Sequence, residues 1–194
     1  MSFPTQPAHV HFGDWDEETR KHPAQKWMEH IVHTIFDAHK WSTPYSDIYA
    51  DDFTLLKPDG SEVKGGKAGW EAVAELYGPF VSQRTEPFYL VTTQTNYGWE
   101  MIGMANIFAI LPGQADAEEE KVKDQKGIEW DVKMSGGFRF QYKRHPSAKY
   151  DGIVLQMVQI TSDSGPVVKK MLVRGMSNPS DLGLWSTLEP SNDS

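Results

Sequence analysis

The chain contains no cysteine, which excludes disulfides, thiolate metal sites and a cysteine nucleophile. It also lacks any basic stretch longer than a pair, and 27 acidic residues outnumber 19 lysines and arginines. A nucleic-acid partner is therefore not expected, because phosphate binding needs clustered positive charge. No apolar run approaches the roughly 20 residues that cross a bilayer, and the N-terminus has no basic-then-apolar signal pattern. These absences predict a cytoplasmic protein with neither a membrane nor a nucleic acid as partner.

Cofactor and metal motifs are missing as well. The sequence has no glycine-rich phosphate loop and no G-x-S-x-G nucleophile turn. Its seven histidines are not spaced as metal ligands on one helix or strand face, apart from His9 and His11 near the N-terminus. We therefore expect no metal site and no cofactor.

The composition that remains is that of a folded domain. Hydrophobic residues make up 39% of the 194 residues and aromatic residues 12%, which is typical of globular proteins. We predict an N-terminal arm over residues 1–21, one domain over 22–176 and a C-terminal tail over 177–194, in which Trp185 and Leu188 could contact the domain.

Hydrophobic spacing predicts the elements of the domain. Apolar residues recur at helical spacing over 22–40, where Pro23 starts the helix, and again over 70–80; a short helix should end near Tyr49. Later segments follow the pattern of strands and predict an antiparallel sheet: 53–56, 88–95, 99–111, 128–144, 153–162 and 167–176. The acidic segment 112–127 reads as a solvated hairpin loop.

One segment carries a resemblance. Tyr49-Ala50-Asp51-Asp52-Phe53-Thr54 is followed by Pro58-Asp59-Gly60 and by Gly65-Gly66 before a helix. In this order, the region 22–176 resembles the nuclear-transport-factor-2-like superfamily, which includes SnoaL-like polyketide cyclases and ketosteroid isomerase. The resemblance implies an α+β fold, in which a cone-shaped, curved antiparallel sheet packs on N-terminal helices and encloses a cavity for a small apolar ligand.

The residues of ketosteroid isomerase are not reproduced at the matching positions. Lys57 stands where that family has its general-base aspartate, immediately before the proline of the hairpin. The family's helix-one tyrosine falls at Val32 or His33, and its second acidic donor falls near Met157. That isomerisation is not expected, whereas the polyketide-cyclase and dehydratase branches remain open.

Three titratable residues are the catalytic candidates. His39 shares a broad helical arc with Val32 and Ile35, so it could relay a proton, although a capping histidine packed under Trp41 is the more common arrangement. Asp52 and Lys57 would form an acid–base pair if both turned inward. The alternative is that Asp52 closes a turn.

The aromatic and methionine content favours an adaptable apolar pocket, although most such residues are ordinary core. The strand over 153–162 has apolar residues on both faces, so the outer face of the sheet should be covered too, and a homodimer packed through the sheet would provide that cover. The residues expected to bind the ligand are Val32, Tyr49, Trp70, Tyr77, Trp99, Asn106, Arg139 and Met157.

These observations lead to two functional hypotheses. The first is a cofactor-independent isomerase, cyclase or dehydratase that acts on a small apolar polycyclic or polyketide-like metabolite. The second is a binding or protein-association module of the same fold without catalysis. Titratable groups that are hydrogen-bonded beside a void would favour the first, and a purely apolar lining would favour the second.

Overall fold

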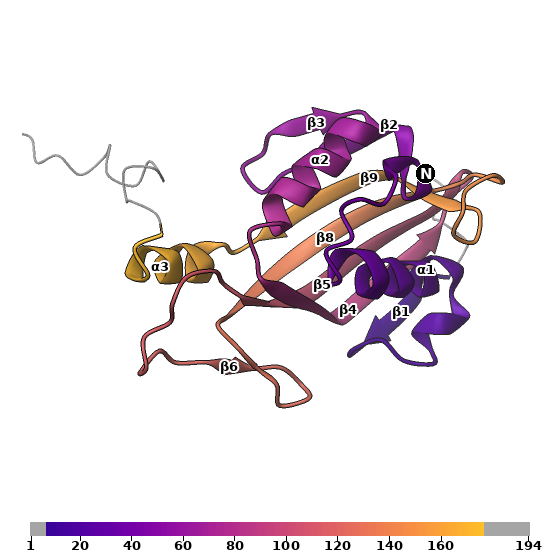
Figure 1. Ribbon diagram of the computed structural model, residues 1–194. Coiled ribbons are helices and arrows are strands. Elements are labelled where there is room, and N and C mark those ends of the chain that lie inside the picture. The colour runs from indigo at the N-terminus through magenta and orange to yellow at the C-terminus, as the bar shows by residue number, and fades with distance from the viewer. Residues whose placement is uncertain (1–6, 177–194) are drawn as a thin grey trace, which may run out of the picture.

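The computed structural model describes residues 7–176, whose centre is one seven-stranded sheet with the strand order β1-β4-β5-β8-β9-β2-β3 (Figure 1). Five of its six strand pairings are antiparallel, and only β2 and β9 run parallel. The sequence predicts an antiparallel sheet, and the observed sheet is mixed because of this one parallel pairing. Its strands are β1 (His9–Phe12), β2 (Tyr49–Leu56), β3 (Glu62–Lys64), β4 (Ser82–Gln94), β5 (Gly98–Ile110), β8 (Val132–Arg144) and β9 (Ile153–Ser162).

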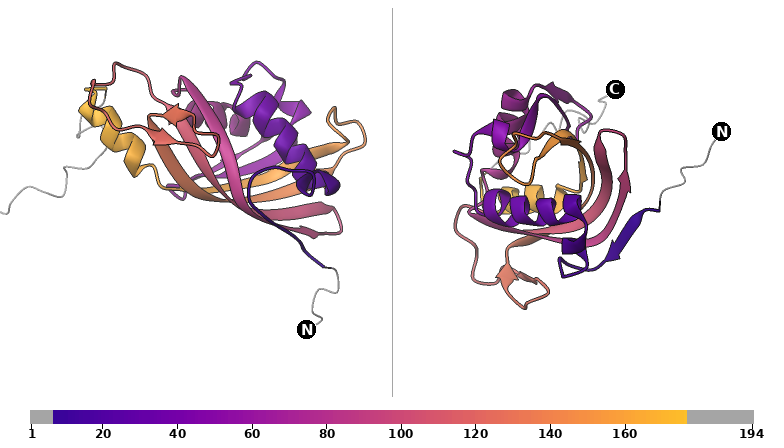
Figure 2. Two further views of the ribbon diagram at one scale, coloured as in Figure 1. Left: turned by 90° about the horizontal axis from the view of Figure 1, so that it is seen from below. Right: turned by 90° about the vertical axis from the view of Figure 1, so that its right-hand side faces the viewer.

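The sheet curves around α1, as the two views in Figure 2 show, so the predicted α+β cone is confirmed. A proline at the first turn of α1 agrees with the predicted start of that helix. The helices are α1 (Pro23–Ile31), α2 (Gly66–Tyr77) and α3 (Gly165–Val173), with the short turns η1 (Thr19–Lys21) and η3 (Tyr45–Asp47) and the π-helical turn η2 (Val32–Phe36).

Irregular strand pairing accompanies the curvature. The register of β4 against β5 shifts between Pro87 and Tyr89, which marks a β-bulge. Pro87 suits this position, because it has no N–H to give to the ladder. The carbonyl of Phe88 accepts a hydrogen bond from the N–H of Gly13 at 3.1 Å, which continues the pairing of β1 with β4 by one residue. This bond ties the segment after β1 to the sheet.

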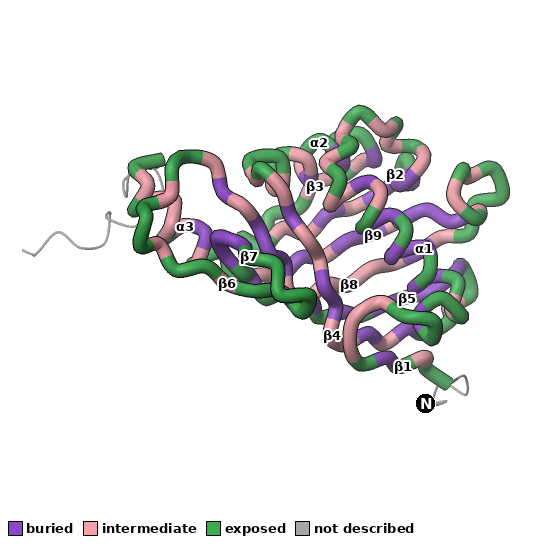
Figure 3. Tube along the Cα trace, turned by 60° about the horizontal axis from the view of Figure 1, so that its bottom comes forward, coloured by how far each residue is buried: buried purple, intermediate pink, exposed green. Residues whose placement is uncertain are grey.

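The main core lies between the concave face of the sheet and the helices. Trp27 of α1 is 1% exposed and meets the edge-on ring of Tyr142 of β8, which is fully buried. Phe138 and Phe140 share that face with Tyr142, as the period-two pattern predicts. Figure 3 shows buried residues following the strands, while exposed residues gather in the connections.

The prediction of a last strand over 167–176 is wrong, because this segment forms α3. The two adjacent valines suggested a strand, but Pro166 lies in the first turn, where a proline favours a helix. Val167 and Met171, four residues apart, face the same side and pack on a second core cluster that contains Ile107 and Met134. Packing against this cluster therefore favours the helix over the strand that the valines suggest.

Most of the acidic segment 112–127 is exposed and it leads into a hairpin, as the sequence predicts, but it also contains a short strand and one buried carboxylate. Val122–Lys123 (β6) pairs with Glu129–Trp130 (β7), and Trp130 packs near Phe108 at a ring distance of 6.4 Å. Asp124 is 6% exposed and accepts hydrogen bonds from the N–H groups of Lys126 and Ile128 and from Trp130 Nε1. The Asp124 carboxylate thus holds the turn of a hairpin whose other residues are largely exposed.

The predicted N-terminal arm contains β1, which pairs with β4 and extends the sheet. The sequence analysis did not predict this strand, since four residues provide too little pattern. Among residues 7–176, no helix is long and apolar enough to cross a membrane. The predicted tail, with Trp185 and Leu188, lies outside the described residues.

Candidate functional site

A cavity of about 90 Å³ lies between α1, α2 and the concave face of the sheet, and we call it the inner cavity. Most of its wall is apolar, and polar atoms come from only a few side chains. Such a lining suits a small apolar molecule that is oriented by few hydrogen bonds. The lining residues are Trp15, Met28, Val32, Phe36, Tyr49, Val73, Tyr77, Gln83, Thr85, Pro87, Leu90, Met101, Gly103, Met104, Ala105, Ile107, Phe138, Phe140, Leu155, Val158 and Ile160.

Two tyrosines, Tyr49 and Tyr77, line the inner cavity. Tyr49 is 2% exposed, and its ring stacks on Phe53 at 3.9 Å between centroids. Burial raises the pKa of Tyr49, and the nearby Tyr77 adds to this rise. Burial likewise raises the pKa of Tyr77, with a further contribution from Asp37. Both phenols are therefore neutral near pH 7 and can donate a hydrogen bond to a ligand oxygen.

A carboxylate lies directly behind this wall. Oδ1 of Asp37 accepts a hydrogen bond from the hydroxyl of Thr85 at 2.9 Å, and Oδ2 accepts one from the Thr85 N–H at 3.1 Å. Burial raises the pKa of Asp37, although Thr85, His33 and Gln83 favour its charged form. Thr85 therefore both lines the cavity and donates to a carboxylate with a raised pKa.

The π-helical turn positions this carboxylate. The N–H of Asp37 bonds to the carbonyl of Val32 at 2.8 Å, and that of Lys40 bonds to Ile35 at 2.9 Å, so both bonds span five residues. A π turn holds one more residue than an α turn, and such turns occur often at functional sites. The extra residue brings Asp37 against β4, while Val32 and Phe36 still line the cavity.

A second void of about 340 Å³ adjoins the first, and we call it the outer cavity. It lies between the end of α2, the β2–β3 turn, β8, β9 and α3. Tyr77, Ile107 and Ile160 line both cavities and form the partition between them. The remaining lining residues of the outer cavity are Lys57, Pro58, Asp59, Leu76, Pro79, Phe80, Met134, Ser162, Ser164, Val167 and Met171.

The structure does not bring the three catalytic candidates together. His39 has a positive φ of 50° and packs its ring near Trp41 at 5.7 Å. Asp52 is exposed and lies 3.8 Å from Lys143, while Lys57 lies 3.8 Å from Asp59 at the outer cavity. The condition for an Asp52–Lys57 pair, that both turn inward, is thus not met. The catalytic role of each residue stays a prediction.

The residues predicted to bind a ligand separate into three groups. Val32, Tyr49 and Tyr77 line the inner cavity. Trp70 and Trp99 are buried core residues that line neither cavity: Trp70 Nε1 donates to the Trp41 carbonyl, and Arg144 lies over the ring of Trp99. Register places Asn106, Arg139 and Met157 on the convex face, away from both cavities.

The polar residues that the sequence analysis missed are Asp37, Gln83 and Thr85. Alternation along β4 puts Gln83 and Thr85 on one face, but the predicted strand began at residue 88 and left both out. Asp37 follows the last apolar residue of a helix, where an acidic residue is usually solvated. The two polar residues at period two before Pro87 were the available signal.

No group of three or more histidine or acidic side chains between residues 7 and 176 is arranged to hold a metal ion. In the acidic segment, Glu119 pairs with the cations Lys170 and Arg174. Two hydrogen bonds from Arg174 are the main cause that lowers the pKa of Glu119 to about 2. The acidic segment therefore fastens α3 to the sheet end, and α3 in turn lines the outer cavity.

Comparison with known proteins identifies the fold. No family model and no curated protein matches the sequence. Among solved structures, an NTF-2 like protein of unknown function from Pseudomonas aeruginosa aligns with 73% of this chain and 99% of its own, with a TM-score of 0.50 and 13% identity. The chain therefore has the nuclear-transport-factor-2-like fold.

Two further structures have this similarity and a stated activity. A putative polyketide cyclase from Acidithiobacillus ferrooxidans covers 79% of this chain and 96% of its own, with a TM-score of 0.51 and 15% identity. A hexachlorocyclohexane dehydrochlorinase from Novosphingobium barchaimii covers 73% and 84%, with a TM-score of 0.51 and 12% identity. At these identities the likeness establishes the fold alone, so function has to be argued from the site.

Proposed function

We propose that this chain is a cofactor-independent enzyme that transfers a proton on a small, largely apolar molecule in the inner cavity, in an isomerisation, cyclisation or elimination. The observation that carries the proposal is Thr85, a residue of the cavity wall whose hydroxyl donates to Asp37. Thr85 Oγ can accept a proton from the ligand while it passes its own to Asp37. Neutral Tyr49 and Tyr77 would stabilise the negative charge that develops on a ligand oxygen.

Two sets of catalytic residues are thus proposed. His39, Asp52 and Lys57 form the set from the sequence, and Asp37, Thr85 and Tyr77 form the set from the geometry. The second set is favoured, because its members are linked to one another at one wall of one cavity. The similarity in fold to a putative polyketide cyclase and to a dehydrochlorinase is compatible with proton-transfer chemistry.

The test is a model proton abstraction. In 5-nitrobenzisoxazole a base removes the ring C–H proton, the electron pair forms a nitrile and the N–O bond breaks to release a phenolate. We expect the protein to accelerate this reaction above buffer, and we expect Asp37→Asn and Thr85→Val each to lower the rate about a hundredfold, within the usual range for general-base catalysis. Asp52→Asn is the matched control, since that carboxylate is exposed.

The pH profile adds a second readout. Because burial raises the pKa of Asp37, the rate should rise with pH through a value above 3.8, and Asp37→Asn should abolish this dependence. Loss of rate in Asp52→Asn with full rate in Asp37→Asn would reverse the assignment between the two sets. An unaccelerated reaction in the wild type would remove the catalytic proposal for this reaction class.

The second candidate is a binding module without catalysis, favoured by the small number of polar atoms in the lining. N-phenyl-1-naphthylamine is a suitable neutral probe, because its fluorescence rises in an apolar site. Saturable binding that is competed by apolar molecules, together with no acceleration of the model reaction, would support binding alone.

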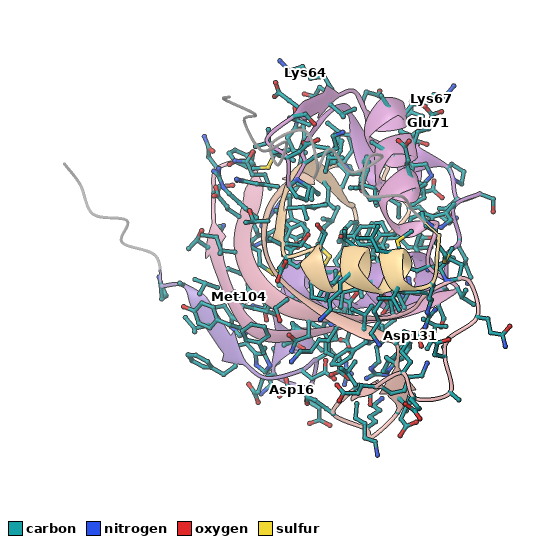
Figure 4. All side chains as sticks on the ribbon, turned by 90° about the vertical axis from the view of Figure 1, so that its left-hand side faces the viewer. Asp16, Lys64, Lys67, Glu71, Met104 and Asp131 are labelled. Carbon is teal, nitrogen blue, oxygen red and sulfur yellow. The ribbon has the colours of Figure 1, made fainter. Side chains whose placement is uncertain are left out.

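We also propose a homodimer through the convex face of the sheet. Phe12 is 75% exposed, Ile102 53% and Met104 43%, and the strand registers place their side chains together on that face, although residue Met104 also borders the inner cavity. Figure 4 places Met104 on the outer side of the sheet. An exposed apolar patch of this kind is typical of an association surface. Size-exclusion chromatography with light scattering should give a dimer for the wild type and a monomer for Ile102→Lys, and a monomeric wild type would contradict the proposal.

A further inference from the structure

The outer cavity has an apolar base and a charged rim. Ile107, Ile160 and Val167 belong to the base and are 3%, 4% and 7% exposed. The two charged residues of the wall, Lys57 and Asp59, belong to the turn between β2 and β3, and the Asp59 side chain is 65% exposed. A wall of this kind suits a molecule with an apolar body and a polar group at one end.

The strand pattern places Lys57 on the apolar face of β2. Phe53 and Leu55 are fully buried, and Lys57 follows them at the same period of two. The Lys57 side chain is 30% exposed. A lysine stem packs readily along apolar surface while its ammonium stays in water. Lys57 therefore supplies a positive charge where the apolar wall of the outer cavity meets solvent.

The charge of Lys57 is only loosely paired. Its Nζ lies 3.8 Å from Oδ2 of Asp59, which is beyond hydrogen-bond distance. The other oxygen of Asp59, Oδ1, accepts hydrogen bonds from the N–H of Ser61 at 2.8 Å and from the Ser61 hydroxyl at 2.6 Å. Asp59 is thereby held by its own turn, and an exposed ion pair without a hydrogen bond contributes little to stability. The Lys57 ammonium can therefore pair with an incoming anion without giving up a hydrogen bond to Asp59.

We propose that the molecule bound in the two adjoining cavities is a carboxylic acid with an apolar body, whose carboxylate pairs with Lys57 at the rim of the outer cavity. In a chain of net charge -8, such a ligand needs a local positive group at the point where it enters. This inference rests on the proposed binding of a small, largely apolar molecule. It adds the chemical class of that molecule, and it makes Lys57 a residue that determines specificity.

Two probes of the same shape separate charge from apolar contact. 2-Naphthoic acid is ionised at pH 7, whereas 2-naphthamide has the same ring system and a neutral amide in place of the carboxylate. The outer cavity of about 340 Å³ exceeds the roughly 150 Å³ cavity known to hold benzene, so it has room for a two-ring body. Both probes are measured by displacement of N-phenyl-1-naphthylamine, which is neutral.

The measured quantity is the ratio of the two dissociation constants, 2-naphthamide over 2-naphthoic acid. We expect Lys57→Met to lower this ratio about fivefold relative to the wild type, the change that one partly exposed ionic hydrogen bond produces. Lys57→Arg keeps the charge and should preserve the preference for the acid, and Asp59→Asn should raise the ratio because it removes a competing carboxylate. Lys64→Met is the matched control. It removes the same charge from the same hairpin, but Lys64 is 75% exposed, lines neither cavity and lies at the edge of the molecule in Figure 4.

The outcomes separate this inference from the function on which it rests. An equal ratio in the wild type and in Lys57→Met, with both probes still bound, overturns the role of Lys57 and leaves apolar binding intact. A fall of the same size in Lys64→Met overturns that role too, because net charge alone would then account for the preference. Displacement by neither probe in the wild type removes the proposed binding of apolar molecules and this inference together. Lys57→Gln provides a second neutral variant should Lys57→Met fail to fold.

Discussion

Replacement of Arg174 by methionine tests how the acidic segment holds α3. The Arg174 side chain is 2% exposed, and its Nε and Nη2 donate to the two carboxylate oxygens of Glu119 at 3.0 and 2.6 Å. Nη2 also lies 2.9 Å from Asp131, and Nη1 donates to the carbonyls of Leu111 and Pro112 at 3.0 and 3.1 Å. One guanidinium therefore satisfies four groups at the end of the sheet, near Asp131 in Figure 4.

The expected loss follows from what remains after the substitution. Glu119 and Asp131 are 10% and 3% exposed, and removing one partner of a buried ion pair typically costs about 3–5 kcal/mol. Lys170 still pairs with Glu119 and Lys121 with Asp131, so the lower end applies. We expect Arg174→Met to lower the free energy of unfolding by about 3 kcal/mol, or the midpoint temperature by roughly 6–12 °C.

Urea unfolding followed by circular dichroism measures this loss. Lys21→Met is the control, because Lys21 and Glu18 are 64% and 62% exposed, and such a pair contributes less than about 1 kcal/mol. The pKa of Glu119 is lowered from 4.5 to about 2, so its ionic contribution is complete above pH 4.5 and is lost as the pH falls toward 2. An Arg174→Met variant as stable as the wild type at pH 7 would refute the proposed role of Arg174 in holding α3. The same loss of stability at pH 2 as at pH 7 would refute the ionic part of that role.

Two further substitutions test other parts of the fold. Burial, followed by the charge of His9, lowers the pKa of His22 from 6.5 to about 4, so the unfolded chain binds its proton first and stability should fall as the pH drops from 6.5 to 4. His22→Gln should flatten the stability curve over that window, and an unchanged slope would contradict the assignment. A Cβ at Gly69 would lie 2.4 Å from the ring of Phe53, so Gly69→Ala should cost about 1–3 kcal/mol in urea unfolding. Gly137→Ala is the control, because its Cβ meets no atom within 4 Å, and it should change stability by less than about 0.5 kcal/mol. Equal losses in the two variants would contradict the predicted clash, because they would show that α2, which carries Gly69, moves to accommodate the methyl group.

Periodic burial explains which parts of the fold could be predicted from sequence. Phe138, Phe140 and Tyr142 alternate with polar residues along a long strand, and all three face inward. The strand over residues 153–162 was predicted with the bounds that the structure has. Opposite Gln141 and Tyr142, the register of β9 shifts by one residue. Leu155 and Val158, three residues apart, therefore both line the cavity, which a strict alternation of every second residue does not predict.

Segments were mispredicted where long-range contacts overrule local pattern. The parallel pairing of β2 with β9 joins residues about a hundred positions apart, so no local signal specifies its direction. The second core cluster packs against the segment from Gly165, which forms a helix where a strand was predicted. Tertiary contacts of this kind are not encoded in a short window of sequence.

The site shows the same limit at the level of single residues. Val32, Tyr49 and Tyr77 were predicted, because apolar and aromatic positions of the early elements face the sheet. Asp37 was not, because an ideal helix places it about 200° from Ile35, on the side away from the cavity arc. The two bonds that span five residues add a residue to the turn and rotate Asp37 onto β4.

Tyr77 connects the size of the ligand to the proposed chemistry. Its ring forms part of the partition between the inner and outer cavities, while its neutral hydroxyl lies within the electrostatic reach of Asp37. A molecule larger than the inner cavity can therefore not fill both voids without contacting or displacing this ring. Displacement would also move the phenol relative to the Thr85 hydroxyl, since α2 carries one and β4 the other. Ligand size and the geometry of proton transfer are consequently coupled through one side chain, whatever the ligand is.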